Sequence, residues 1–113
     1  HIKWFANIMT KDSIYQYILC DNELPVGQIR LNIEGDKAFI DYSIAAKYRG
    51  MGYGTTLMQL FLQELETVKM LDKRTLVGQV KQENLASARV FEKCGFTPIK
   101  KKDVIQYELV WRQ

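Results

Sequence analysis

The chain of 113 residues has few of the side chains that most catalytic and metal sites need. It contains one histidine, His1, and two cysteines, Cys20 and Cys94, which are far apart in the sequence and have no close Cys or His neighbours. Zinc sites need clustered Cys and His ligands, and Ser-His or Cys-His catalysis needs a histidine beside the nucleophile. The sequence therefore argues against a metal site and such a hydrolase, and predicts two free thiols in a reduced, cytoplasmic protein.

Long apolar runs and a strong charge of one sign are also missing. No stretch approaches the roughly 20 apolar residues that cross a bilayer, and no basic-then-apolar leader is visible. The net charge of +3 is small and dispersed, and the basic run at 100–102 is typical of a solvated turn. We expect no membrane or nucleic-acid partner and a single domain over 1–113. The start at a residue other than methionine indicates either an artificial start or a piece of a longer protein.

The first half of the chain alternates between apolar and polar residues, which is typical of strands. This pattern predicts strands at 14–20, 26–34 and 38–44, with a tight hairpin at "EGDK" (34–37). Residues 2–9 (IKWFANIM) are expected to form the end of a short helix.

The second half alternates helices with strands. Apolar residues at helical spacing predict a helix over 53–69, and Asn84 as N-cap with Gly95 just past the end predicts another over 84–95. Strands are predicted at 75–80 and twice more before the C-terminus. This order indicates an α+β fold in which helices pack on a sheet.

The stretch "KYRGMGYGTT" (47–56) places three glycines between a strand and a helix. Backbone N–H groups at a helix N-terminus bind phosphate, and glycines let the anion approach closely. Lys47 and Arg49 supply nearby positive charge. The alternative is that the glycines only form a sharp turn and allow close helix–sheet packing.

Two common phosphate-binding motifs do not match this stretch. A P-loop needs Gly-Lys-Ser/Thr before the helix, and Gly54 is followed by Thr55 and Thr56. The dinucleotide fingerprint needs G-x-G-x-x-G and an acidic residue at the end of the next strand, where Gln79 and Val80 stand.

The spacing R-x-x-G-x-G at 49–54, together with Asn84 and "ARVFEKCGF" (88–96), resembles the GNAT (Gcn5-related N-acetyltransferase) superfamily over about residues 1–111. The resemblance implies a mixed, mostly antiparallel sheet whose central parallel strands, 38–44 and 75–80, splay apart and are flanked by helices. Compared with the family, the N-terminal strand and the first helix are missing.

The resemblance also implies acetyl-CoA as cosubstrate, held in the gap between the splayed strands, and no metal. Residues 49–54 would hold the pyrophosphate, strand 38–45 would pair with the pantetheine amides, and Asn84 would bond to the same arm. The implied cofactor-binding residues are Ile44, Ala45, Arg49, Gly50, Met51, Gly52, Tyr53, Gly54 and Asn84.

The activity implied is direct acetyl transfer to a primary amine of a small molecule, an amino sugar or a peptide, by a protein that can form a homodimer. The alternative is a non-catalytic or degenerate coenzyme A-binding module, possibly a fragment of a longer protein. Two departures from the family pattern support this alternative: the usual general base and the usual general acid are both replaced.

An amine must lose a proton before it attacks, because its pKa is about 10.4. Many family members carry a glutamate where this chain has Phe39, so the candidate base is Asp41, on the same face of the strand. Its alternative role is that of an ordinary strand carboxylate. Glu23 and Asp21 are weaker candidates.

The family's usual general acid is a tyrosine, and the matching residue here is Phe91. Ser87, one helical turn earlier, is the candidate in contact with the thiol, with a helix-capping role equally open. Tyr53 and Tyr107 are expected to be packing residues. Backbone N–H groups near Ile44 would polarise the thioester carbonyl.

Overall fold

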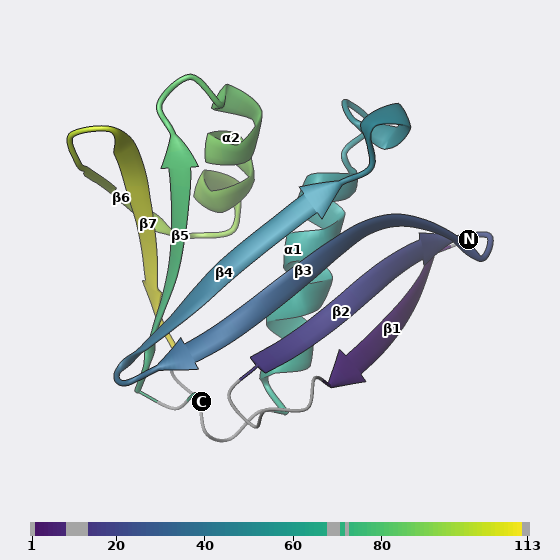
Figure 1. The fold of residues 1–113 in the computed structure, drawn as a ribbon, viewed down its shortest axis with the longest axis horizontal. Helices are drawn as coiled ribbons and strands as arrows, with labels where there is room; N and C mark the ends of the chain where they lie inside the picture. Colours follow the sequence, from purple (N-terminus) through teal and green to yellow (C-terminus); the bar gives the residue numbers. More distant parts are fainter. Residues whose placement is uncertain (1, 9–13, 68–70, 72, 112–113) are drawn as a thin grey trace.

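The computed structural model describes residues 2–8, 14–67, 71 and 73–111. It contains one seven-stranded sheet in the order β1-β2-β3-β4-β5-β7-β6 (Figure 1). The strands are β1 (Ile2–Ile8), β2 (Ile14–Asp21), β3 (Leu24–Glu34), β4 (Lys37–Ile44), β5 (Thr75–Lys81), β6 (Thr97–Lys100) and β7 (Val104–Val110). Among the described residues, only β4 and β5 pair in parallel, so the expected mixed, mostly antiparallel sheet is confirmed.

The alternating segments form strands close to the expected bounds. In β3 the apolar side chains Val26, Ile29 and Leu31 are fully buried, while the polar positions between them face the other side. The hairpin from β3 to β4 turns at Gly35, whose φ of +61° is a conformation that glycine adopts without steric penalty. Both cysteines are free, as expected.

The expected helix over residues 2–9 is wrong. Residues Ile2–Ile8 form β1, which pairs antiparallel with β2 over its whole length, from Ile2 opposite Asp21 to Ile8 opposite Tyr15. Residue 9 lies outside the described residues. Pairing with β2 gives hydrogen-bond partners to every second residue of β1. The free energy gained from these long-range bonds outweighs the helix preference of a short sequence pattern.

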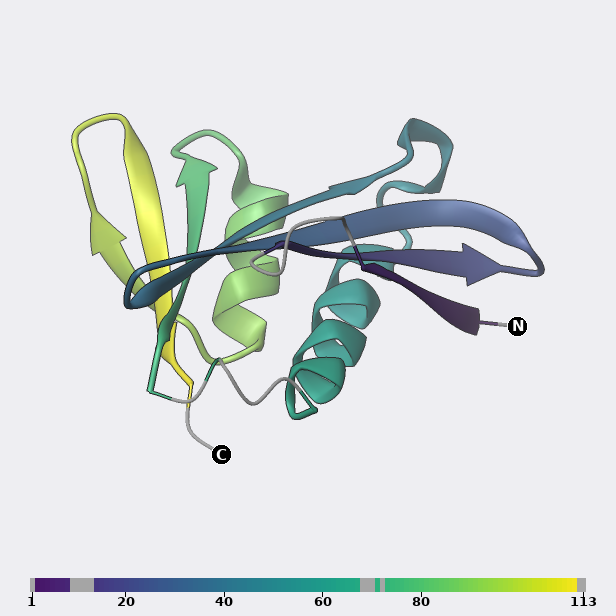
Figure 2. The same ribbon diagram turned by 60° about the horizontal axis from the view of Figure 1, so that its bottom comes forward.

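Two helices cover one face of the sheet (Figure 2). Helix α1 (Tyr53–Leu65) ends four residues before the predicted position 69, and 68–69 lie outside the described residues. Helix α2 (Leu85–Lys93) has Asn84 as its N-cap, as predicted. The core lies between this helical layer and the sheet, around the fully buried side chains of Leu57, Phe61 and Tyr107.

The two parallel strands separate after a short contact. β4 pairs with β5 only from Lys37 opposite Thr75 to Ile40 opposite Gly78, although both strands continue beyond this point. Figure 1 shows β4 and β5 diverging towards the end that carries α2 and the loop before α1. The predicted splayed pair is thereby confirmed, and the gap positions the site.

Candidate active site

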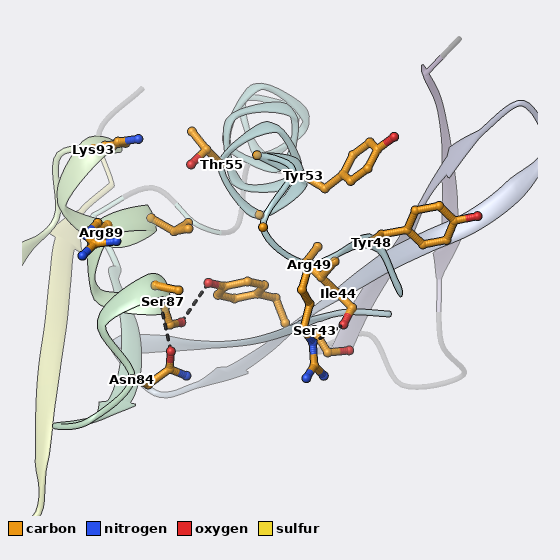
Figure 3. Close-up of a pocket in the computed structure, with 16 residues that line it drawn as sticks. Ser43, Ile44, Tyr48, Arg49, Tyr53, Thr55, Asn84, Ser87, Arg89 and Lys93 are labelled. Carbon is orange, nitrogen blue, oxygen red and sulfur yellow. Dashed lines mark hydrogen bonds between the residues drawn. The ribbon is translucent and has the colours of Figure 1, made fainter. Parts of the chain in front are cut away.

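A cavity of about 610 Å³ opens where β4 and β5 diverge (Figure 3). It is bounded by the end of β4, the loop that follows it, the first turn of α1 and the exposed side of α2. Its lining residues are Tyr42, Ser43, Ile44, Tyr48, Arg49, Gly50, Gly52, Tyr53, Gly54, Thr55, Asn84, Ala86, Ser87, Arg89, Val90 and Lys93. This volume lies within the range typical of small-molecule sites.

Two of the loop glycines are required by backbone conformation. Gly50 and Gly52 have φ values of +78° and +83°, and Gly52 is the N-cap of α1. No side chain caps this helix, and its first turn carries no acidic residue. Residues 52–55, at the start of α1, line the cavity, and this helix N-terminus has no side-chain cap, which favours an anionic ligand.

The third glycine has a packing role. A Cβ atom on Gly54 would lie 3.2 Å from Val90 Cγ2 on α2 and 3.8 Å from Tyr42 Cε2 on β4. Gly54 thus lets the start of α1 approach both elements. Positive φ at Gly50 and Gly52 and close packing at Gly54 both fit the alternative of a sharp turn with close helix–sheet packing. Phosphate binding by the same loop stays a prediction.

The charged side chains at the cavity are cationic. Arg49, Arg89 and Lys93 line it, and no carboxylate does among the described residues. Lys47 lies 5.1 Å from the centre of the Tyr48 ring and is not part of the lining. Sequence reasoning missed Arg89 and Lys93, although their i, i+4 spacing on the predicted helix places both cations on one side.

The end of β4 offers a free strand edge to the gap. Ala45 N–H donates to Val26 O at 2.9 Å, so residue 45 bonds to β3. Bonding alternates along an antiparallel pair, and the peptide groups of Tyr42 and Ile44 therefore point the other way, where pairing with β5 has already ended at Ile40. Arg49 Nε donates to this edge, to Ile44 O at 3.0 Å.

One hydrogen bond joins β4 to α2 across the inner part of the cavity. The hydroxyl oxygens of Tyr42 and Ser87 are 2.8 Å apart, and Ser87 N–H donates to Asn84 Oδ1 at 3.1 Å. Figure 3 shows Ser87 with both bonds drawn. Burial raises the pKa of Tyr42 above its ordinary 10.0, and a nearby Cys94 adds to this, although the bond to Ser87 acts in the opposite direction. No sequence signal pointed to Tyr42, because the alternating pattern marks it only as an apolar position of a strand.

The predicted site residues divide between the cavity and its surroundings. Those that line it are Ile44, Arg49, Gly50, Gly52, Tyr53, Gly54, Asn84 and Ser87. Ala45 and Met51 are exposed outside the lining. Asp41 is exposed on the opposite face of β4, opposite Arg30 of β3. Of the weaker candidates, Glu23 is exposed, and Asp21 accepts a hydrogen bond from Tyr53 at 2.5 Å.

Phe91, at the position of the family's tyrosine, does not reach the cavity. Its side chain is 2% exposed and stacks on Tyr107, with ring centres 5.3 Å apart. Tyr107 is a buried packing residue, as expected, and its hydroxyl donates to Glu92. Tyr53 packs against Tyr48, as expected, and it also lines the cavity.

Fold and site together define an α+β domain with a glycine loop at an uncapped helix N-terminus, beside a split in its sheet. The family profile of the Acetyltransferase (GNAT) domain matches residues 1–97, and the chain therefore belongs to that family. It is 26% identical over 96 residues to the uncharacterized N-acetyltransferase YfmK of Bacillus subtilis, a match covering 84% of this chain. The chain spans 62% of the length of that relative.

Solved structures with the same fold include several acetyltransferases. The chain is similar to the spermidine N-acetyltransferase of Vibrio cholerae in complex with CoA and spermine, with a TM-score of 0.75, 19% identity and coverage of 88% of this chain and 66% of that one. It is also similar to the ribosomal-protein-S18-alanine N-acetyltransferase of Escherichia coli, with a TM-score of 0.76, 19% identity and coverage of 92% and 73%. At this identity the likeness establishes the fold.

The described part of the chain contains no helix long and apolar enough to span a bilayer. Within the same residues, no group of three or more His, Cys, Asp or Glu side chains is placed to hold a metal ion.

Proposed function

We propose that this chain transfers an acetyl group from acetyl-CoA to a primary amine by direct attack of the amine on the thioester. The observation that carries the proposal is the free edge of β4 leading into the uncapped N-terminus of α1. An extended chain with amide groups adds to such an edge, and a pyrophosphate fits the N–H groups at the glycine loop. Arg49, Arg89 and Lys93 supply the charge that a polyanionic cosubstrate needs.

The acceptor amine would approach from the other face of the sheet. The gap between β4 and β5 passes through the sheet, and the face without helices presents Asp41 beside it. In this reading Asp41, or water ordered by it, accepts the ammonium proton, and the peptide N–H groups at the end of β4 polarise the thioester carbonyl. The acceptor classes are a small-molecule amine, an amino sugar or a peptide amine. We place the protein in the cytoplasm and allow a homodimer.

Titration calorimetry with CoA and acetyl-CoA, followed by a thiol-release assay with a panel of amines, tests the proposal. Polyamines, amino sugars and peptides with a free N-terminus form the panel, and mass spectrometry of the product locates the acetyl group. Binding with thiol release that depends on the amine is the expected result. Binding without transfer to any amine would favour a non-catalytic coenzyme A module, and no binding would reject both.

A further inference from the structure

A hydrogen-bonded pair of hydroxyl groups, from Tyr42 and Ser87, lies in the cavity. Tyr42 on β4 and Ser87 on α2 are 45 residues apart in sequence, and their oxygens lie 2.8 Å apart. Both residues line the cavity, and Tyr42 is half-buried. Asn84 fixes Ser87 by capping its backbone N–H, so one partner is held by the first turn of α2.

Tyr42 lies where the acyl end of the cosubstrate would come to rest. If the pyrophosphate is at residues 49–54, the arm passes Ile44 first and extends towards the point where β4 and β5 join, at Ile40 and Gly78. Tyr42 is two residues deeper than Ile44, about 7 Å along the strand. The Tyr42 hydroxyl is thus at the acyl end of the path of the pantetheine arm, and the glycine loop at 49–54 is at its pyrophosphate end.

The other tyrosines of the cavity are directed elsewhere. The Tyr53 hydroxyl donates to Asp21 on β2, and Tyr48 packs edge-to-face on Tyr53 with ring centres 5.8 Å apart. Figure 3 shows both rings pointing away from Ser87. Phe91 carries no hydroxyl, and the Tyr42 ring rests against it with centres 5.9 Å apart.

We propose that Tyr42, hydrogen-bonded to Ser87, is the general acid that protonates the departing thiolate of CoA. This inference rests on the proposed function. The amine nitrogen forms a bond to the carbonyl carbon, the C–S bond breaks with its electron pair going to sulfur, and the Tyr42 O–H proton moves to that sulfur. The phenolate regains a proton from solvent through Ser87, and the ammonium proton leaves by way of Asp41 or water. The nitrogen loses a second proton, to water, as the amide forms. Two protons therefore leave the nitrogen and the phenolate takes one up, so each transfer releases one proton.

The surroundings keep Tyr42 protonated at neutral pH. Its pKa is raised mainly by burial, so the hydroxyl remains a donor throughout the range in which the amine loses its proton. The ionisable group that acts on it is Cys94 of α2, whose own pKa is raised by burial. Arg49, Arg89 and Lys93 line the same cavity, as does Tyr53 of α1, whose hydroxyl is bonded to Asp21. The other neighbours, Gly54 of α1 and Ile29 of β3, do not titrate.

Steady-state kinetics of Tyr42→Phe tests the role directly. We expect kcat to fall at least tenfold, while the affinity for CoA stays within about threefold of the parent. Tyr107→Phe is the matched control, because it removes a hydroxyl on the other side of Phe91 and outside the cavity. Cys94→Ser removes the nearby thiol, so an ionisation that persists in the pH–kcat profile of this variant does not come from Cys94.

A second arm reports on contact with sulfur without turnover. Tyrosine labelled with ¹³C at Cζ gives one NMR signal for each ring, and Tyr42→Phe assigns the signal of Tyr42. We expect CoA to shift this signal more than desulfo-CoA does, with the Tyr107 signal unmoved. The pH–kcat profile should fall where Tyr42 ionises, and replacing Tyr42 by a fluorinated, more acidic tyrosine should move this falling limb to lower pH.

The inference is overturned if Tyr42→Phe keeps kcat within threefold of the parent, or if CoA and desulfo-CoA shift the Tyr42 signal equally. These results leave the proposed function standing, because the parent still binds CoA and transfers the acetyl group. A parent that binds no CoA overturns the proposed function itself, and this inference with it.

Discussion

The ring of Phe91 lies directly against the backbone of Gly78. A Cβ atom at residue 78 would come within 2.3 Å of Phe91 Cζ, a separation that folded proteins do not tolerate. The glycine in the middle of β5 therefore makes room for the aromatic ring of α2 at the point where β4 and β5 stop pairing. The para carbon of Phe91 is turned towards the sheet and away from the cavity.

Phe91→Tyr should leave the rate nearly unchanged, because the added hydroxyl extends from Cζ into the backbone at Gly78. Overpacking of this kind is expected to lower the stability by about 1–3 kcal/mol. Thermal unfolding and kcat, measured on the same sample, check both parts. A tenfold gain in kcat would show that the hydroxyl reaches the reacting atoms after all.

Gly52→Val should weaken CoA binding at least tenfold, about 1.4 kcal/mol. Residue 52 has a φ of +83°, which a β-branched residue avoids, and its Cβ would stand at the start of α1 where the pyrophosphate is proposed to lie. Gly35→Val is the matched control: it introduces the same strain at a φ of +61°, in a hairpin outside the cavity. Calorimetry that gives unchanged affinity in a folded Gly52→Val protein would reject the loop as the pyrophosphate site.

Asp41→Asn should lower kcat/KM by roughly 10²-fold, the usual scale for a general base, with CoA affinity unchanged. The substitution keeps the shape of the side chain and removes its ability to accept the ammonium proton. Glu34→Gln, an equally exposed carboxamide change at the far end of the β3–β4 hairpin, is the control. Activity within threefold of the parent would leave Asp41 with a structural role on the strand.

Tyr107 should make the stability depend on alkaline pH. Burial, and the hydrogen bond from its hydroxyl to Glu92 Oε2 at 2.7 Å, raise the pKa of Tyr107 to about 12. Below pH 10 the tyrosine is protonated in both the folded and the unfolded chain, and its contribution to the free energy of unfolding is complete. Between pH 10 and about 12 the unfolded chain ionises first, so the free energy of unfolding falls as pH rises.

Urea unfolding of Tyr107→Phe at pH 8 and pH 11 checks this dependence. The variant should be less stable at pH 8 by about 1 kcal/mol, from the lost hydrogen bond, and should lose less on going to pH 11 than the parent does. Burial also raises the pKa values of Tyr42 and Tyr17, so the stability of the variant still falls somewhat between pH 8 and pH 11. Equal losses in both proteins would contradict the assignment to Tyr107.

Local sequence predicts those parts of the molecule that short-range rules control. Alternation placed β2, β3 and β4 nearly at their bounds, and Asn84 marked the start of α2. The glycines at 50, 52 and 54 located the loop before α1, because positive φ and close approach are properties that glycine alone supplies cheaply. These signals act over a few residues, so no knowledge of distant segments is needed.

Tertiary structure decided the rest, because the deciding contacts join segments far apart in the chain. Residues 2–8 became a strand through pairing with β2, and the side chains of Arg89 and Lys93 reached the cavity through the packing of α2 beside α1. Tyr42 alternates with its neighbours like any strand residue. Only the folded chain brings its hydroxyl to Ser87, 45 residues away, across a gap that exists because β4 and β5 stop pairing at Ile40 and Gly78.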